Sequence, residues 1–168
     1  IDETRFASSV RENRVQYTAL VAKSARLKAL AEGKPFIVPD DVQKEDPKTV
    51  DEERRLYESR RTELETTQSI ARQQLSQRQQ ELVEVRAKYQ QAARAYEISA
   101  KELSVTKPLI ESGAVSEVEL LRLERDVGRF RGERDMAAAQ SSRIQASISE
   151  ANHKLEEVSL AFRNEAGK

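Results

Sequence analysis

The sequence contains no cysteine, and only 5% of its 168 residues are aromatic. Without thiols, the chain can form neither a disulfide framework nor a thiolate metal site. Glycine and proline are also scarce, at five and four residues, whereas a domain with many turns normally needs more of both. With so few aromatic residues and a mean hydropathy of -0.74, a single thick globular core is not expected.

The chain also lacks an excess of charge and a long apolar run. Lys plus Arg and Asp plus Glu both number 29, so no net field attracts nucleic acid or anionic lipid. No apolar run approaches the roughly 18 residues that span a bilayer, and the opening "IDETRF" resembles neither a signal peptide nor a basic anchor. Because helix signals start at once and a heptad repeat reaches the last residues, we interpret the chain as part of a larger protein.

Charged residues make up 35% of the chain, and Ala, Glu, Arg, Gln and Leu are abundant, as in long helices and coiled coils. The first 33 residues are predicted to form a helix that ends at Gly33. Its apolar residues recur every three or four positions, at Phe6, Val10, Tyr17, Leu20, Leu27 and Ala31.

A proline-rich connection follows over residues 34–48, where "KPFIVPDDVQKEDPK" carries three prolines and several acids. Thr49 and Glu52 fit a capping box at the start of a second helix, predicted over 49–112.

Two heptad columns run along this second helix, and two more run along the segment 116–168. Such narrow, sustained columns are typical of a coiled coil, and a helix of about 60 residues needs a partner along its length. If the chain reverses at residues 113–115, Leu82 faces Ile144 and Leu103 faces Leu123. We therefore predict an all-α fold, a long antiparallel coiled-coil hairpin with an additional N-terminal helix. The predicted core comprises Leu75, Leu82, Tyr89, Tyr96, Leu103, Leu123, Phe130, Ile144, Ile148 and Leu155.

The stretch "KPLIESGAVSEVELL" contains the turn chemistry for this reversal. Pro108 lacks the N–H for an interior helix bond, so the helix is predicted to kink or stop there. Gly113 suits the left-handed residue that closes a helix, and Ser116 with Glu119 forms a second capping box. These features predict where the hairpin reverses without requiring a function.

Few residues suggest chemistry. His153, the only histidine, has no metal-ligand partners and is interpreted as a solvated helix residue. The acids from Asp51 to Glu53 are interpreted as a solvated helix start. We therefore predict no enzyme activity, metal site or cofactor. Gly128 and Gly132 have G-x-x-x-G spacing, which indicates either close approach of a helix or local flexibility.

The phrases "IDETRFASSVRENRVQYTALVAKSARLKAL" and "LIESGAVSEVELLRLERDV" resemble the helical arm of HlyD-family membrane fusion proteins, the periplasmic adaptors of bacterial type I secretion systems for proteases and lipases. The resemblance spans nearly the whole chain. It implies an arm that bridges an inner-membrane ABC exporter to a TolC-like outer-membrane channel and neighbours other adaptor subunits in a ring. It also implies a periplasmic location, with an inner-membrane anchor outside this chain.

In this family the tip carries an Arg, a Leu four positions later, and a Ser or Thr seven positions after that. Leu109 and Ser116 match the last two members, whereas Val105 occupies the Arg position, so the Arg contact is either absent or replaced by a nearby charge such as Lys101 or Lys107. The resemblance therefore implies a docking tip, which we assign to Val105, Lys107, Leu109, Glu111, Gly113 and Ser116.

The first helix has no counterpart in the simple hairpins of drug-efflux adaptors. We expect it to lie roughly in line with the second helix, with both packing on a third helix that continues in the intact protein. Within this chain alone, it would fold back or pair with another chain. Two alternative functions stay open: a multidrug-efflux adaptor hairpin, and an intracellular coiled-coil scaffold or dimerisation module.

Overall fold

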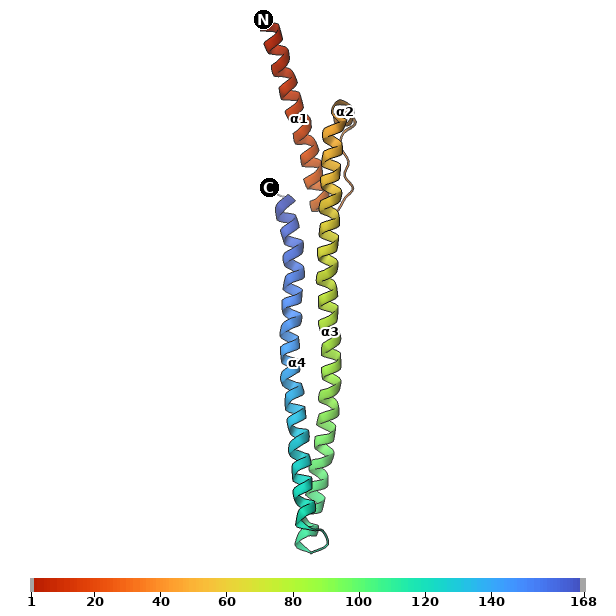
Figure 1. Cartoon of the computed structure of the whole chain (residues 1–168), viewed down its shortest axis with the longest axis vertical. Helices are drawn as coiled ribbons and strands as arrows, with labels where there is room; N and C mark the ends of the chain where they lie inside the picture. Colours follow the sequence, from red (N-terminus) through yellow and green to blue (C-terminus); the bar gives the residue numbers. More distant parts are fainter. Residues whose placement is uncertain (1, 167–168) are drawn as a thin grey trace. The chain divides into compact units, whose positions relative to one another are not determined.

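The computed structural model describes residues 2–166, which form four helices (Figure 1). These are α1 (Asp2–Glu32), α2 (Asp40–Glu45), α3 (Pro47–Glu111) and α4 (Glu117–Ala166). The described chain divides into two compact units, each built from segments of α3 and α4. Unit 1 comprises residues 2–72 and 153–166, and unit 2 comprises residues 73–152.

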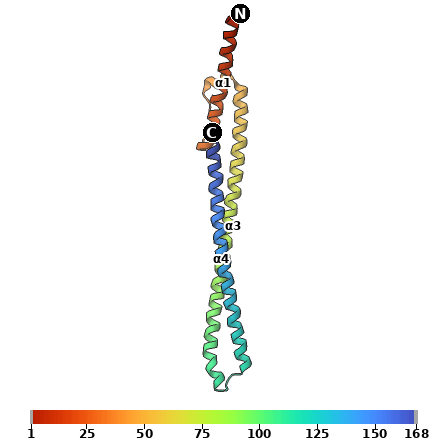
Figure 2. The same cartoon turned by 90° about the vertical axis from the view of Figure 1, so that its left-hand side faces the viewer.

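Helices α3 and α4 pack side by side and antiparallel, which confirms the predicted all-α hairpin (Figures 1 and 2). In unit 2, most of the buried residues recur every seventh position, as a coiled coil requires. They are Val85, Ala92 and Ser99 in α3, and Leu123, Ala137 and Ile144 in α4. In unit 1, the Gln68 amide donates a hydrogen bond to Ser159 Oγ at 3.4 Å. Along the sequence, the two residues are almost equally distant from Gly113, which agrees with the predicted register.

The two predicted columns of α3 are buried to different depths. The column of smaller residues, which includes Val85 and Ala92, lies deepest between the helices. Among the residues assigned to the core, Leu123 and Ile144 are buried and Tyr89 is 40% exposed. The half-buried members are Leu75, Leu82, Tyr96, Leu103, Phe130, Ile148 and Leu155. Two helices enclose only one narrow seam, so the second column of α3 lies along its edge.

Helix α1 lies beside the first turns of α3 in unit 1 and runs in the same direction (Figures 1 and 2). Small residues make the contact, because Ala22 and Ala29 are buried in one cluster with Val50 and Tyr57. Alanines permit close approach of two helix backbones. Helix α1 therefore overlaps α3 instead of lying end to end with it, which corrects the arrangement expected from the sequence.

The connection between α1 and α3 is ordered and packs on both helices. Gly33 has φ +67° and closes α1, with Lys34 N–H donating to the Ala29 carbonyl at 3.0 Å. Phe36 is buried, and its ring stacks on Tyr57 with ring centroids 5.7 Å apart. Helix α2 buries Val42 in the same cluster. This strap, residues 33–46, thus attaches α1 to the start of α3.

Helix α3 is capped by Asp46 and not by the predicted pair of Thr49 and Glu52. The Asp46 carboxylate accepts hydrogen bonds from Thr49 N–H at 3.3 Å and Thr49 Oγ1 at 2.6 Å. Pro47 takes the first helical position, where its missing N–H leaves no bond unmade. Pro47 starts α3 directly after Asp46, so the helix has already begun when the chain reaches Thr49. Thr49 and Glu52 therefore lie inside α3 and do not cap it.

The acids at the start of α3 are not all solvated. Arg26 Nε donates to Glu53 Oε2 at 2.5 Å, and the two side chains are only 13% and 17% exposed. A second pair joins Arg14 of α1 to Glu45 of α2. The interpretation of Asp51 to Glu53 as a merely solvated run was therefore wrong for Glu53, whose carboxylate lies opposite an arginine from α1.

We expect Tyr57→Phe to lower the free energy of unfolding by about 1 kcal/mol, because Tyr57 OH donates to the Lys34 carbonyl at 2.9 Å. The phenylalanine keeps the stacked ring and loses this bond together with the longer one that the hydroxyl accepts from Arg61 Nη1 at 3.4 Å. Urea denaturation followed by circular dichroism measures the change. Tyr89→Phe, at an exposed position, is the matched control, and equal stability of both variants would contradict a role for the Tyr57 hydroxyl.

Candidate docking tip

The α3 end of the hairpin closes through a well-defined C-terminal cap. Gly113 has φ +80°, in the left-handed region that side chains rarely adopt. The Gly113 N–H donates to the Ile110 carbonyl at 3.0 Å and the Ala114 N–H donates to the Leu109 carbonyl at 2.9 Å. This pair of bonds is a Schellman motif.

Pro108 lies inside α3, one turn before the helix ends. Helix α3 therefore continues through Pro108 and ends at Glu111, instead of stopping at the proline. The reason is local, since the proline removes one N–H while its own carbonyl still accepts the Ser112 N–H at 3.4 Å. Such a position tolerates proline because the remaining turn is completed by the cap.

Ser116 caps α4 as predicted, with its Oγ accepting the Glu119 N–H at 3.3 Å. The Glu119 carboxylate accepts a bond from Arg122 at 2.6 Å. This hydrogen bond, with the attraction between the two charges, raises the pKa of the Arg122 guanidinium. The helix start therefore uses the serine half of the capping box, while Glu119 pairs along the helix surface.

The six residues assigned to the tip lie in the last two turns of α3, the turn, and the residue that caps α4. All are exposed: Val105, Lys107, Leu109, Glu111, Gly113 and Ser116. The Leu109 carbonyl accepts bonds from Ala114 and Val115, so its backbone is fixed by the turn. Its side chain is nevertheless 44% exposed. Turn formation therefore uses the backbone of Leu109 and leaves its apolar side chain accessible.

Two further apolar residues near the tip were missed from the sequence. Val118 and Leu121 are 76% and 64% exposed in the first turns of α4. The available signal was their position, because both lie outside the two heptad columns of α4 although they are large and apolar. With Val105 and Leu109, they concentrate exposed apolar side chains at the closed end of the hairpin.

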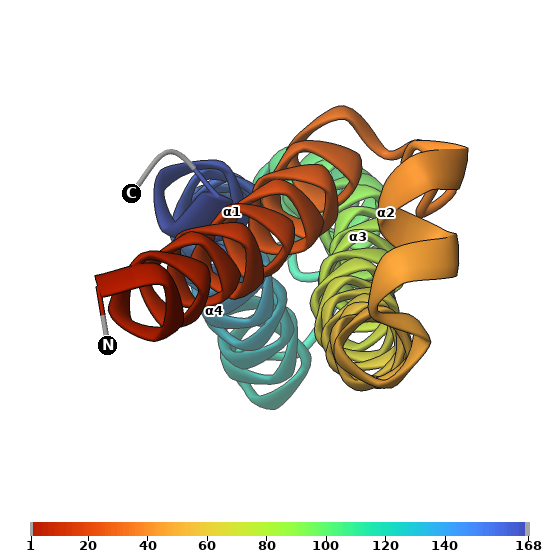
Figure 3. The ribbon, with the colours of Figure 1, turned by 90° about the horizontal axis from the view of Figure 1, so that it is seen from above.

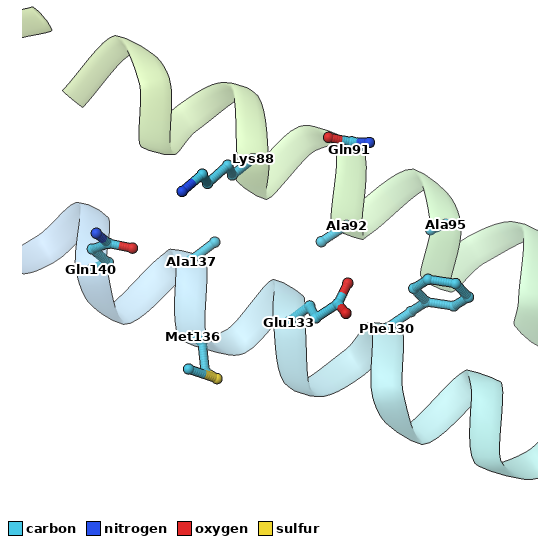
Figure 4. Close-up of a pocket in the computed structure, with 9 residues that line it drawn as sticks. All are labelled: Lys88, Gln91, Ala92, Ala95, Phe130, Glu133, Met136, Ala137 and Gln140. Carbon is cyan, nitrogen blue, oxygen red and sulfur yellow. The ribbon is translucent and has the colours of Figure 1, made fainter. Parts of the chain in front are cut away.

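A groove lies farther along unit 2, between α3 and α4, with a volume of about 350 Å³ (Figure 4). Alanines form part of its floor, and Lys88 and Glu133 are its ionisable lining residues. The lining residues are Lys88, Gln91, Ala92, Ala95, Phe130, Glu133, Met136, Ala137 and Gln140. One lysine and one glutamate on opposite helices do not make a nucleophile with its base. The groove is a consequence of small residues facing each other across the seam.

A family model described as AprE, long alpha-helical hairpin, matches residues 6–168. The chain belongs to this AprE hairpin family. The match covers the strap and α1 as well as the hairpin, so the extra N-terminal helix is part of the family's fold. A comparison with curated protein sequences finds no significant match.

Among solved structures, the AprE-family hairpin is similar to the soluble domain of LipC, described as a membrane fusion protein of a type I secretion system. The TM-score is 0.90 at 16% sequence identity. The similarity covers 99% of this chain and 65% of the LipC chain. At this identity the comparison establishes the fold, and the chain spans about two thirds of the protein it resembles.

Residues 2–166 of the AprE-family hairpin contain no helix that is long and apolar enough to cross a membrane. The same residues contain no group of three or more acidic or histidine side chains arranged to hold a metal ion. His153 is exposed on α4. The tip presents exposed apolar side chains at Val105, Leu109, Val118 and Leu121.

Proposed function

We propose that this chain is the helical arm of a periplasmic adaptor for type I protein secretion, which docks through its hairpin tip onto a TolC-like outer-membrane channel. The observation that carries the proposal is the exposed Leu109 side chain on a backbone fixed by the Gly113 cap. Membership of the AprE hairpin family and the fold shared with LipC support it.

The tip suits docking because its apolar side chains are not required for the turn. Leu109, Val118 and Leu121 are each at least 44% exposed. An exposed apolar side chain on a rigid backbone loses little conformational freedom on binding, and its burial by a partner is favourable. Position 105, where the family motif has an arginine, contributes a valine that is 62% exposed.

In this proposal the arm is structural. It joins an inner-membrane ABC transporter, which hydrolyses ATP, to the outer-membrane channel, and it stands beside neighbouring adaptor subunits in the periplasm. The anchor to the inner membrane belongs to the intact adaptor. The chain's own contribution is a helical pair that presents a defined end.

We expect Leu109→Asp to reduce export of the natural cargo strongly while the arm stays folded. A charge at a desolvated interface anchor typically costs 2 kcal/mol or more of binding, about a thirtyfold loss of affinity. At this exposed turn the substitution should change the free energy of unfolding by no more than about 0.5 kcal/mol. Export, crosslinking to the outer-membrane channel and circular dichroism are measured together on the full-length adaptor.

Ser116→Asp separates helix capping from docking. Aspartate caps a helix about as well as serine, so α4 should begin at the same residue and the melting temperature should be preserved. Its negative charge should still weaken the crosslink to the channel. If both variants fold, crosslink and export like the parent, Leu109 and Ser116 serve only the turn and the docking proposal is wrong.

A further inference from the structure

Three exposed apolar side chains form a ridge along one face of α3, and the ridge ends at the tip. Ile98 and Val105 are each 62% exposed, and Leu109 is 44% exposed. They follow one another at steps of seven and four residues, which places them on the same face of a helix. Near the tip, α4 lies beside α3 and covers it on one side only (Figures 1 and 3). We call these three residues the α3 ridge.

The two lysines near Val105 in the sequence do not bring a charge to the tip end of the α3 ridge. Lys107 is two residues past Val105, or about 200° around the helix, and therefore lies on the opposite side of α3. Lys101 lies one turn before Val105, about 6 Å farther from the tip. Helical side chains also lean toward the N-terminus of their helix, which for α3 is away from the tip. A partner that meets Val105 and Leu109 therefore meets apolar side chains.

The charged groups around the α3 ridge disfavour an acidic partner. Glu102 lies one heptad before Leu109, so a carboxylate shares this face of α3. On α4, Arg122 donates to Glu119 at 2.6 Å. This bond and the charge of Glu119, together with the charge of Glu102, raise the pKa of the Arg122 guanidinium, so the cation already has carboxylate partners within the chain. An acidic surface would be repelled by Glu102, whereas an apolar surface would bury the ridge favourably.

We propose, on the basis of the docking function above, that the surface of the TolC-like channel that receives the α3 ridge is apolar and uncharged, and that Val105 determines which channels the arm accepts. A valine is complementary to an apolar acceptor. It would leave a carboxylate acceptor desolvated without a partner, so a channel with an acidic acceptor is rejected. Leu109 is then the anchor of the interface, and Val105 supplies the specificity.

Binding of the full-length adaptor to the purified TolC-like channel of the same secretion system tests the proposal. Val105→Arg should weaken binding by about tenfold or more, because the guanidinium is desolvated against an apolar surface. Val105→Leu keeps the apolar character and should bind within about threefold of the parent.

Ser104→Arg is the matched control. It adds the same charge one residue away, at an exposed position of α3 outside the ridge, and should leave the affinity unchanged. Val105→Arg that binds as tightly as the parent or more tightly overturns the proposal. An equal loss in Ser104→Arg also overturns it, because any added positive charge would then suffice.

The salt dependence of binding is a second readout. Raising the salt from about 0.1 M to about 1 M shortens the Debye length from about 10 Å to about 3 Å, so a contact made by charges loses affinity. Binding through the α3 ridge should change by less than about threefold, and a loss of about tenfold or more contradicts an apolar acceptor.

Leu109→Asp, measured in the same binding assay, separates this proposal from the docking function. If Leu109→Asp abolishes binding while Val105→Arg binds like the parent, docking stands and the apolar acceptor is wrong. If Leu109→Asp also binds like the parent, the tip does not dock and both proposals are wrong.

Discussion

Leu123→Asp is expected to lower the free energy of unfolding by about 4 kcal/mol, because it places an unpaired carboxylate in the seam between α3 and α4. Leu123 is only 2% exposed and belongs to the heptad column that continues with Ala137 and Ile144. The substitution removes a large apolar side chain and buries a charge at the same position. Urea denaturation followed by circular dichroism measures the loss.

Leu121→Asp is the matched control for this prediction. Leu121 lies two residues away in the same helix and is 64% exposed. The same chemical change should therefore alter the free energy of unfolding by no more than about 0.5 kcal/mol. Similar losses for both variants would show that charge near the start of α4, and not burial in the seam, determines stability.

Cysteines that replace both Leu82 and Ile144 should form a disulfide and stabilise the chain by about 4 kcal/mol, through the lost entropy of a long unfolded loop. Ile144 is buried and Leu82 is half-buried. The predicted register sets them opposite each other, and the contact of Gln68 with Ser159 supports that register. Oxidation followed by non-reducing electrophoresis measures the crosslink, and chemical denaturation measures the stability.

Cysteines at Val83 and Arg143 provide the control pair. Each position is shifted by one residue and is exposed, so their side chains leave the seam on different sides and should stay reduced within one molecule. An efficient crosslink in the control, or none between positions 82 and 144, would show that the register of the hairpin is wrong.

The hairpin was predictable because its determinants are local or periodic. Gly113 and Ser116 define the turn through their own backbone preferences, and the heptad columns specify which faces meet. The depth of each column was not predictable in the same way. The two columns of α3 look equivalent in the sequence, yet the column of Val85 and Ala92 is buried while Leu75, Leu82 and Leu103 of the other column are only half-buried.

The start of α3 and the position of α1 depended on contacts distant in the sequence. Thr49 and Glu52 formed a plausible capping box, but the cap is Asp46, fixed by Pro47 after it. The bond of Arg26 to Glu53 joins residues whose pairing no local pattern indicates. At the tip, Ser116 was found from its capping role, whereas Val118 and Leu121 were missed although their positions outside the two heptad columns of α4 indicated exposure.

The cap at Gly113 also determines the order in which the hairpin assembles. Every contact between α3 and α4 joins residues on either side of this one turn, so the entropy of loop closure is lost almost entirely when the layers next to it form. Each further layer of paired residues then buries apolar side chains at little additional cost in loop entropy. Pairing therefore proceeds from the tip toward Ala71 and Val158. The contacts between residues that are farthest apart in the sequence thus form last. The long helical pair then folds at a rate typical of proteins with mostly local contacts.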